Sequence, residues 1–166
     1  MKTINFTRGV PADESFPIDD IVEAAGNALK TTGTAMLQYG SSLGFQPLRA
    51  WIAEWQHVSV DRVLTSNGSL QLIEFLCLHK LEAGGVVFTE SPTYDRAVTL
   101  LRRHHAKVVG IPLDADGPNI EALERALAKQ VPAFFYIIPD FQNPAGATCS
   151  EPSGGASWSS PPGTVS

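Results

Sequence analysis

The chain contains little cysteine and no long apolar run. Its two cysteines, Cys77 and Cys149, are far apart and in no metal-ligand spacing. Cys77 lies in an apolar run of helical character, so we expect a buried, reduced thiol rather than a disulfide partner. No run of about 18 apolar residues occurs, which argues against a membrane-spanning helix, and residues 1–5 lack the apolar region of a secretory signal. These absences predict a cytoplasmic protein.

Positive charge is also scarce. Lys and Arg number 12 against 17 Asp and Glu, which gives a net charge of −5. Nucleic acids and anionic membranes both require a basic surface, so neither is an expected partner. The chain has no G-x-S-x-G and no G-x-x-x-x-G-K-[ST], and hydrolase and P-loop functions therefore lack support. His104 and His105 follow two arginines, a pattern that favours a solvated helix end over a metal or acid–base pair.

Amphipathic helices alternate with short apolar strands along residues 18–138. Helical spacing is found at residues 18–29, 48–55, 69–80, 94–101 and 118–127, and strand candidates at 63–65, 86–89, 107–111 and 133–138. The segment 69–80 is apolar nearly all round, which predicts a buried helix. Continuous apolar strands between helices predict an α/β fold, with a mostly parallel sheet that helices cover on both faces.

The composition changes after Glu151. Residues 152–166 are dominated by Pro, Gly and Ser and carry no charge. Such a segment has too little apolar surface to offset the entropy of ordering, so we expect it to be disordered. One interpretation is a linker. We favour the hypothesis of a reading-frame slip after Glu151, because codons for Lys-Arg-Arg in a GC-rich gene, read one base late, give Ser-Gly-Gly. Resequencing the locus would decide between the two.

Four motifs in the chain resemble one enzyme family. Residues 139–146 read P-x-x-Q-N-P-x-G, residues 90–94 read E-x-P-x-Y, residues 68–71 read G-S-L-Q and residues 39–49 read Y-G-x-x-x-G-x-x-x-L-R. Together they resemble the fold-type-I aminotransferases that depend on pyridoxal 5'-phosphate (PLP), closest to the 2-aminoadipate aminotransferase-like branch. The resemblance covers nearly all of residues 4–151.

The resemblance implies an incomplete large domain of the fold-type-I PLP-dependent transferase fold. Residues 1–45 would form the N-terminal arm and helix, residues 46–151 a partial PLP-binding large domain, and residues 152–166 the disordered tail.

The resemblance also implies which residues bind the cofactor. Gly68, Ser69 and Leu70 would form the turn that binds the phosphate through backbone N–H groups, with Leu70 in place of a glutamine. The ring of Tyr94 would stack on the pyridine of PLP, and Asn143 would donate to its phenolic oxygen beside the substrate. The alternatives are a serine-capped turn at Gly68-Ser69, a Tyr94 packed in the core, and a turn-forming Asn143.

Two more residues enter through the N-terminal part of the resemblance. Tyr39 would reach from one subunit of a homodimer toward the cofactor phosphate of its neighbour; the alternative is a surface or interface aromatic. Gly9 would offer its backbone to the carboxylate of the substrate. The implied substrates are an amino acid and a 2-oxo acid.

The lysine that holds the cofactor lies well after the Asn-Pro loop in this family. The lysines of this chain all precede that loop, and none has a Ser-x-Ser-Lys-like context: Lys2, Lys30, Lys80, Lys107 and Lys129. Because that lysine forms the covalent link and moves the proton, we expect an inactive fragment. The alternatives are a non-catalytic PLP-binding or dimerisation module, or a fragment of an aminotransferase-domain transcriptional regulator. Unpaired sheet edges and uncovered helices predict aggregation.

Overall fold

The computed structural model describes residue 9 and residues 11–82 and 84–150. The chain divides into two compact units, residues 1–65 and 66–166. The predicted division at residue 45, which follows the family's arm and large domain, stays a prediction. The predicted disordered tail lies outside the described residues.

The first unit is built on two α-helices. It contains the single-turn helix η1 (Asp13–Ser15), the helices α1 (Ile18–Leu37) and α2 (Gln46–Trp55), and the single-turn helix η2 (Val60–Arg62). Both α-helices were predicted from their apolar spacing. Pro17 directly precedes α1, and Asp19 and Asp20 in its first turn carry the charge that a helix N-terminus favours.

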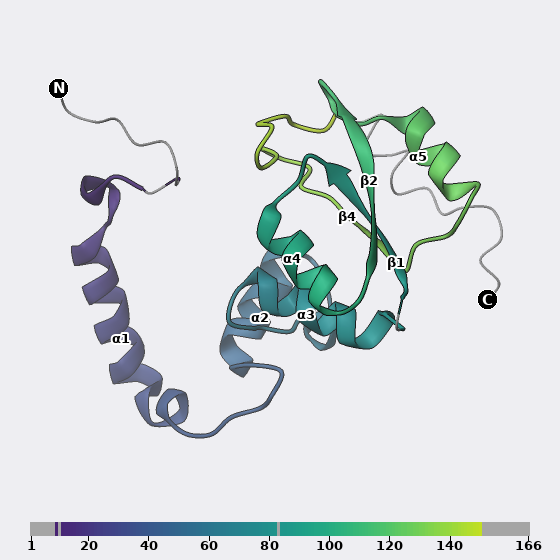
Figure 1. Cartoon of the computed structure of the whole chain (residues 1–166). Coiled ribbons are helices and arrows are strands. Elements are labelled where there is room, and N and C mark those ends of the chain that lie inside the picture. The colour runs from purple at the N-terminus through teal and green to yellow at the C-terminus, as the bar shows by residue number, and fades with distance from the viewer. Residues whose placement is uncertain (1–8, 10, 83, 151–166) are drawn as a thin grey trace. The chain divides into compact units, whose positions relative to one another are not determined.

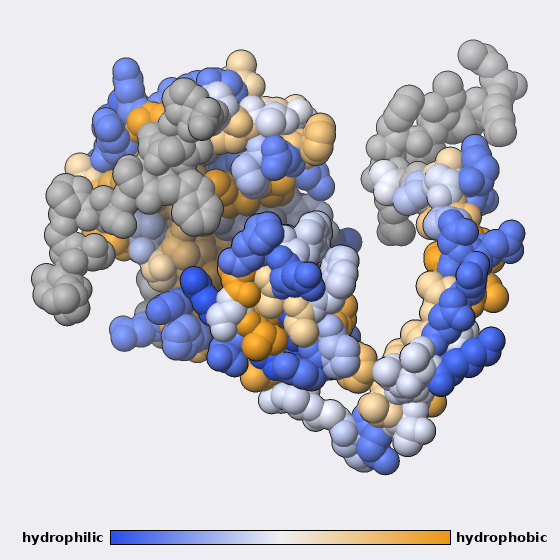
Figure 2. Space-filling model, turned by 180° about the vertical axis from the view of Figure 1, so that it is seen from behind, coloured by the Kyte–Doolittle hydropathy of each residue, from blue (hydrophilic) through white to orange (hydrophobic). Residues whose placement is uncertain are grey.

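Many apolar side chains of α1 are exposed. No residue of α1 is buried, although its sequence is amphipathic. Figure 2 shows orange apolar side chains among blue hydrophilic ones along this helix. Large exposed side chains include Ile18, Ile21, Val22, Leu29 and Leu37. In the part of the chain that the structure describes, no helix is long and apolar enough to cross a membrane.

The predicted strand at residues 63–65 is wrong. These residues are irregular because other groups take up their hydrogen bonds. The N–H of Thr65 donates to the carbonyl oxygen of Leu43 at 3.0 Å, and the carbonyl oxygen of Val63 accepts from Nε of the buried Arg49 at 2.8 Å. A strand requires a partner strand, and the apolar run at 63–65 does not supply one by itself.

The second unit contains the sheet, which has the order β3-β2-β1-β4. Its elements in chain order are α3 (Ser69–Lys80), β1 (Val86–Ser91), α4 (Asp95–Arg103), β2 (Lys107–Asp114), β3 (Gly117–Pro118), α5 (Ile120–Leu127) and β4 (Phe134–Tyr136). The central strand β1 pairs in parallel with β2 and with β4, whereas β2 and β3 are antiparallel. The prediction of a mostly parallel sheet is confirmed.

Helices pack on both faces of this sheet, as predicted (Figure 1). On one face Val87 of β1 forms a buried cluster with Cys77 of α3 and Leu101 of α4. On the other face Phe88 of β1, Ile111 of β2 and Leu123 of α5 form a second cluster. Because neighbouring residues of β1 point to opposite faces, this single strand joins the two halves of the core.

Two local predictions in this unit need correction. The helix predicted from residue 118 begins at Ile120, because Gly117 and Pro118 pair with the end of β2. The segment α3 has the predicted bounds, but only Cys77 in it is buried. The all-round apolar pattern predicted packing on every side, and one side of α3 meets the sheet cluster while Leu72, Phe75 and Leu78 stay exposed.

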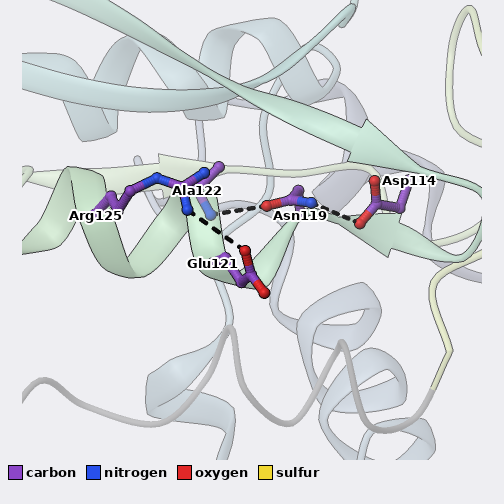
Figure 3. A network of polar contacts seen from close by, with 5 residues as sticks. All are labelled: Asp114, Asn119, Glu121, Ala122 and Arg125. Atoms are coloured by element: carbon purple, nitrogen blue, oxygen red, sulfur yellow. Dashed lines mark hydrogen bonds and ion pairs between the residues drawn. The ribbon is translucent and has the colours of Figure 1, made fainter.

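The start of α5 is fixed by a polar network (Figure 3). Oδ1 of Asn119 accepts from the N–H of Ala122 at 2.8 Å, the pattern of a helix N-cap. Nδ2 of Asn119 donates to Oδ2 of Asp114 at 2.9 Å. Asn119 therefore links the end of β2 to the first turn of the next helix.

Candidate functional site

The candidate site lies where the parallel strands β1 and β4 end. The carboxyl ends of neighbouring parallel strands meet at one edge of the sheet, where α/β proteins commonly bind ligands. The loop after β1 carries Tyr94, and the loop after β4 carries Asn143. Two of the motifs from the sequence therefore meet at the same edge.

Glu90 is a buried carboxylate at this edge. It belongs to β1, and only 3% of its surface is exposed. Its Oε2 atom accepts from the backbone N–H of Ile138 at 3.1 Å and from Nε2 of Gln142 at 3.0 Å. A buried carboxylate needs such donors to replace water. Glu90 therefore anchors the loop after β4 to the end of β1.

Gln142 completes the connection between the two loops. It is also only 3% exposed. Its Nε2 donates to the carbonyl oxygen of Pro92 at 2.9 Å, and its Oε1 accepts from the N–H of Ala145 at 2.8 Å. Its own N–H donates to the carbonyl oxygen of Ala147 at 2.8 Å. The loop after β4 is thus closed on itself and fastened to the loop after β1.

Tyr94 lies directly before α4 and is partly buried. Its carbonyl oxygen accepts from the N–H of Val98 in the first turn at 3.3 Å. Tyr136 lies at the end of β4. Burial is the main cause that raises the pKa of Tyr136, and Glu90 and then the nearby Tyr94 raise it further. Within the described chain, the Oγ1 atom of Thr93 is buried with no hydrogen-bond partner.

Asn143 is exposed and lies in a loop that hydrogen bonds close on both sides of it. Gln142 precedes it, and the N–H groups of Ala145 and Gly146 that follow it both donate back to Gln142. The peptide bonds before Pro92 and Pro144 are both cis. The hydrogen bonds from Ala145 and Gly146 back to Gln142 enclose the backbone of Asn143 in the loop, while Asn143 itself is exposed.

The turn at Gly68 precedes helix α3 and is held by two side-chain hydrogen bonds. Gly68 has φ 91°, a conformation that favours glycine, and an added Cβ would meet nothing within 4 Å. Oε1 of Gln71 accepts from the N–H of Asn67 at 2.8 Å, and Oγ of Ser66 donates to the carbonyl oxygen of Gly68 at 3.0 Å. The exposed Ser69 opens the helix. Backbone N–H groups in the first turn of a helix suit an anion.

Residues from the first turns of α3 and α4 line the same groove. Leu70 and Gln71 of α3 line it together with Arg96 of α4, and its volume is about 290 Å³. The predicted phosphate turn at Gly68–Leu70 and the helix that follows Tyr94 thus belong to one packed pair of helices.

The remaining predicted residues, Gly9 and Tyr39, belong to the first unit. Both are exposed, and the side chain of Tyr39 is completely so. Among the described residues, no three His, Cys, Asp or Glu side chains gather in a way that could hold a metal ion. The pKa of the Cys149 thiol is raised, chiefly by burial and further by the carboxylates of Glu90, Asp116 and Asp140.

Glu90 and Gln142 are functional residues that the sequence indicates only in part. Glu90 directly follows the run Val86–Thr89. A single charged residue beside a buried strand requires a partner if it is itself buried. Gln142 is part of the P-x-x-Q-N-P-x-G loop, in which the family resemblance implies a role for Asn143 alone. Their mutual hydrogen bond joins two loops that are distant in the sequence, and no local pattern indicates it.

Known proteins with similar sequences include aminotransferases and, at lower identity, HTH-type transcriptional regulators from Bacillus subtilis. A 2-aminoadipate transaminase from Thermus thermophilus is 38% identical over 86% of this chain and 36% of its own length. An aromatic-amino-acid aminotransferase from Thermococcus litoralis is 35% identical over 89% of this chain and 38% of its own length. These matches confirm the predicted resemblance.

A solved structure agrees with the fold. The α-aminoadipate aminotransferase of Thermus thermophilus, complexed with N-(5'-phosphopyridoxyl)-L-leucine, matches with a TM-score of 0.83 at 37% identity, over 89% of this chain and 38% of that one. The chain thus spans 36–38% of the length of these relatives. The family described as aspartate aminotransferase matches residues 2–156. On this evidence the chain belongs to the aspartate aminotransferase family.

Proposed function

We propose that the second unit supplies part of a PLP site in an aminotransferase, which transfers an amino group from an amino acid to a 2-oxo acid. The observation that carries the proposal is the fastening of the loops after β1 and β4 by Glu90 and Gln142. It holds Tyr94 and Asn143 at one edge of the sheet. The relative from Thermus thermophilus, whose structure holds a phosphopyridoxyl group, supports the same assignment.

The residues present fit the chemistry of the cofactor. PLP combines a phosphate dianion, an aromatic ring and a phenolic oxygen. The turn at Gly68 leaves open space above a helix N-terminus, which suits the phosphate. Tyr94 offers an aromatic ring, and the exposed amide of Asn143 offers a donor for the phenolic oxygen. When bound, PLP supplies the electron sink for the charge that develops on the amino acid.

Each of these residues would then have a defined task. The N–H groups of Ser69 and Leu70 would bind the phosphate, Tyr94 would cover one face of the ring, and Asn143 would orient the ring beside the substrate. Gly9 and Tyr39 contribute to the substrate and phosphate sites in a homodimer, as the family resemblance implies. We place the protein in the cytoplasm, in line with the composition of its sequence.

Equilibrium dialysis of the purified chain against PLP tests this function. We expect saturable binding, and Asn143→Ala should raise the dissociation constant about tenfold through loss of one hydrogen bond to a charged group. Gln56→Ala removes an exposed amide from the other unit and serves as the matched control. Absence of saturable binding by the unaltered chain, or equal binding by Asn143→Ala, would contradict the proposal.

A further inference from the structure

We propose that Glu90 and Gln142 are positioning residues that fix the distance between Tyr94 and Asn143. Four hydrogen bonds make up this Glu90–Gln142 latch. They are Ile138 N–H to Glu90 Oε2 at 3.1 Å, Gln142 Nε2 to Glu90 Oε2 at 3.0 Å, Gln142 Nε2 to Pro92 O at 2.9 Å, and Ala145 N–H to Gln142 Oε1 at 2.8 Å. The role assigned to the two loops rests on the proposed function, whereas the latch itself is a property of the chain alone.

The chemistry of the latch requires one acid and one amide. A carboxylate only accepts hydrogen bonds, so Glu90 needs donors from both the backbone and the side chain opposite. Gln142 donates with its nitrogen and accepts with its oxygen, and therefore contacts both loops at once. Both side chains are 3% exposed, so water does not substitute for a lost partner without opening of the loops.

The latch acts on Tyr94 and Asn143 through short stretches of backbone. Pro92, whose carbonyl oxygen accepts from Gln142, lies two residues before Tyr94. Asn143 directly follows Gln142 and precedes Ala145, whose N–H donates to the same side chain. Neither Tyr94 nor Asn143 makes a bond of the latch, which leaves their own side chains available to a ligand.

Amide hydrogen exchange in the full chain without cofactor, followed by mass spectrometry, tests the latch directly. Gln142→Glu keeps the shape of the side chain but places a second carboxylate beside Glu90. At pH 7.5 we expect protection in residues 138–147 to fall about 10- to 100-fold, as for loss of a buried charge-assisted bond. Protection in β2 should stay unchanged, because β2 contributes nothing to the latch.

Two further measurements separate positioning from general destabilisation. Proton uptake restores a donor between the two carboxylates of Gln142→Glu, and like charges raise a carboxyl pKa, so protection of residues 138–147 should return as the pH falls toward 4.5. The reciprocal double variant Glu90→Gln/Gln142→Glu should stay unprotected at pH 7.5. A carboxylate at residue 142 cannot donate to the carbonyl oxygen of Pro92, and no single atom of a glutamine at residue 90 can both accept from Ile138 and donate to residue 142. Asn119→Ala, which weakens α5 instead, should not loosen residues 138–147 selectively.

The outcomes are decisive for the latch whether or not PLP binds. Three results would each overturn the proposal. They are absence of protection at residues 138–147 in the unaltered chain, equal protection in Gln142→Glu at both pH values, and full recovery of protection in the double variant at pH 7.5. If dialysis finds no PLP binding but the exchange pattern is as expected, the proposed function fails and the latch stands. If PLP binds equally to the latched and unlatched chains, the positioning role is overturned.

Discussion

Gly110 of β2 lies against Ser91 of β1, so closely that a Cβ added at residue 110 would be 2.9 Å from Cβ of Ser91. Real side chains do not approach to this distance, so one strand must move. We predict that Gly110→Ala destabilises the second unit by about 1–3 kcal/mol, the usual cost of overpacking. Urea unfolding monitored by circular dichroism measures the change.

Gly26→Ala is a suitable control for that substitution. Gly26 lies inside α1, where an added Cβ meets nothing within 4 Å. Alanine in a helix interior is favoured over glycine by about 0.5–1 kcal/mol, so this variant should be neutral or slightly more stable. A Gly110→Ala chain as stable as the unaltered one would show that the strands separate there without cost.

Asn119 is predicted to stabilise α5 through its side chain. Asn119→Ala removes the bond from the N–H of Ala122 and the bond to Asp114 shown in Figure 3. Loss of an N-cap costs about 1 kcal/mol, within a range of about 0.5–2. Asn119→Asp should keep the cap but repel Asp114, and its stability should recover in salt, which screens exposed charges. A salt-independent loss in Asn119→Asp would contradict this account.

Arg49 is predicted to be irreplaceable by lysine. Its guanidinium is buried and donates from Nε to the carbonyl oxygen of Val63 and from a terminal nitrogen to that of Val60, both at 2.8 Å. A single ammonium group cannot reproduce this fork. Arg49→Lys should cost about 1–3 kcal/mol, the penalty of a buried acceptor left without a donor. Tryptophan fluorescence during urea unfolding measures it.

The exposed Arg62 provides the matched control for Arg49. Arg62→Lys makes the same chemical change at the surface, and its effect should lie within about 0.5 kcal/mol. Equal effects at the two positions would show that the bonds of Arg49 to the backbone carry no net stability.

Tyr136 should make the second unit sensitive to alkaline pH. The pKa of Tyr136 lies above its ordinary value of 10.0, chiefly because the residue is buried and further because of Glu90 and Tyr94. The folded state therefore holds the phenolic proton more tightly than the unfolded state, and this contribution to stability is complete below pH 10.0 and lost as the pH rises through the folded pKa. Thermal unfolding between pH 8 and 11 should show a steeper decline for the unaltered chain than for Tyr136→Phe. Parallel declines would contradict the shift.

Much of the fold was predictable because the signals are local. The apolar spacing of α1 and α2 and the apolar runs of β1 and β2 identify these elements without reference to the rest of the chain. The family motifs likewise located Tyr94 and Asn143 at the ends of β1 and β4, which the sheet then brings to one edge.

What was not predictable depends on partners distant in the sequence. The apolar run Val63–Thr65 has the composition of a strand, but its backbone groups bond to Arg49 and Leu43 instead. Pro118 suits a first helical turn as well as a short strand, and the antiparallel pairing with Leu113 decides between them. The bond between Glu90 and Gln142 joins the end of β1 to the loop after β4, and the parallel pairing of these two strands brings its partners together.

The order β3-β2-β1-β4 also has a consequence for synthesis on the ribosome. Both strands of the pair β1–β2 have been synthesised once Asp114 has left the ribosome, whereas β4 comes after α5 and belongs on the opposite side of β1. Until then Glu90 lacks the donors that Ile138 and Gln142 later supply, and as a charged group it should stay hydrated. We therefore expect Glu90 of a nascent chain to stay in contact with water until residues 134–142 have been synthesised and lie beside β1.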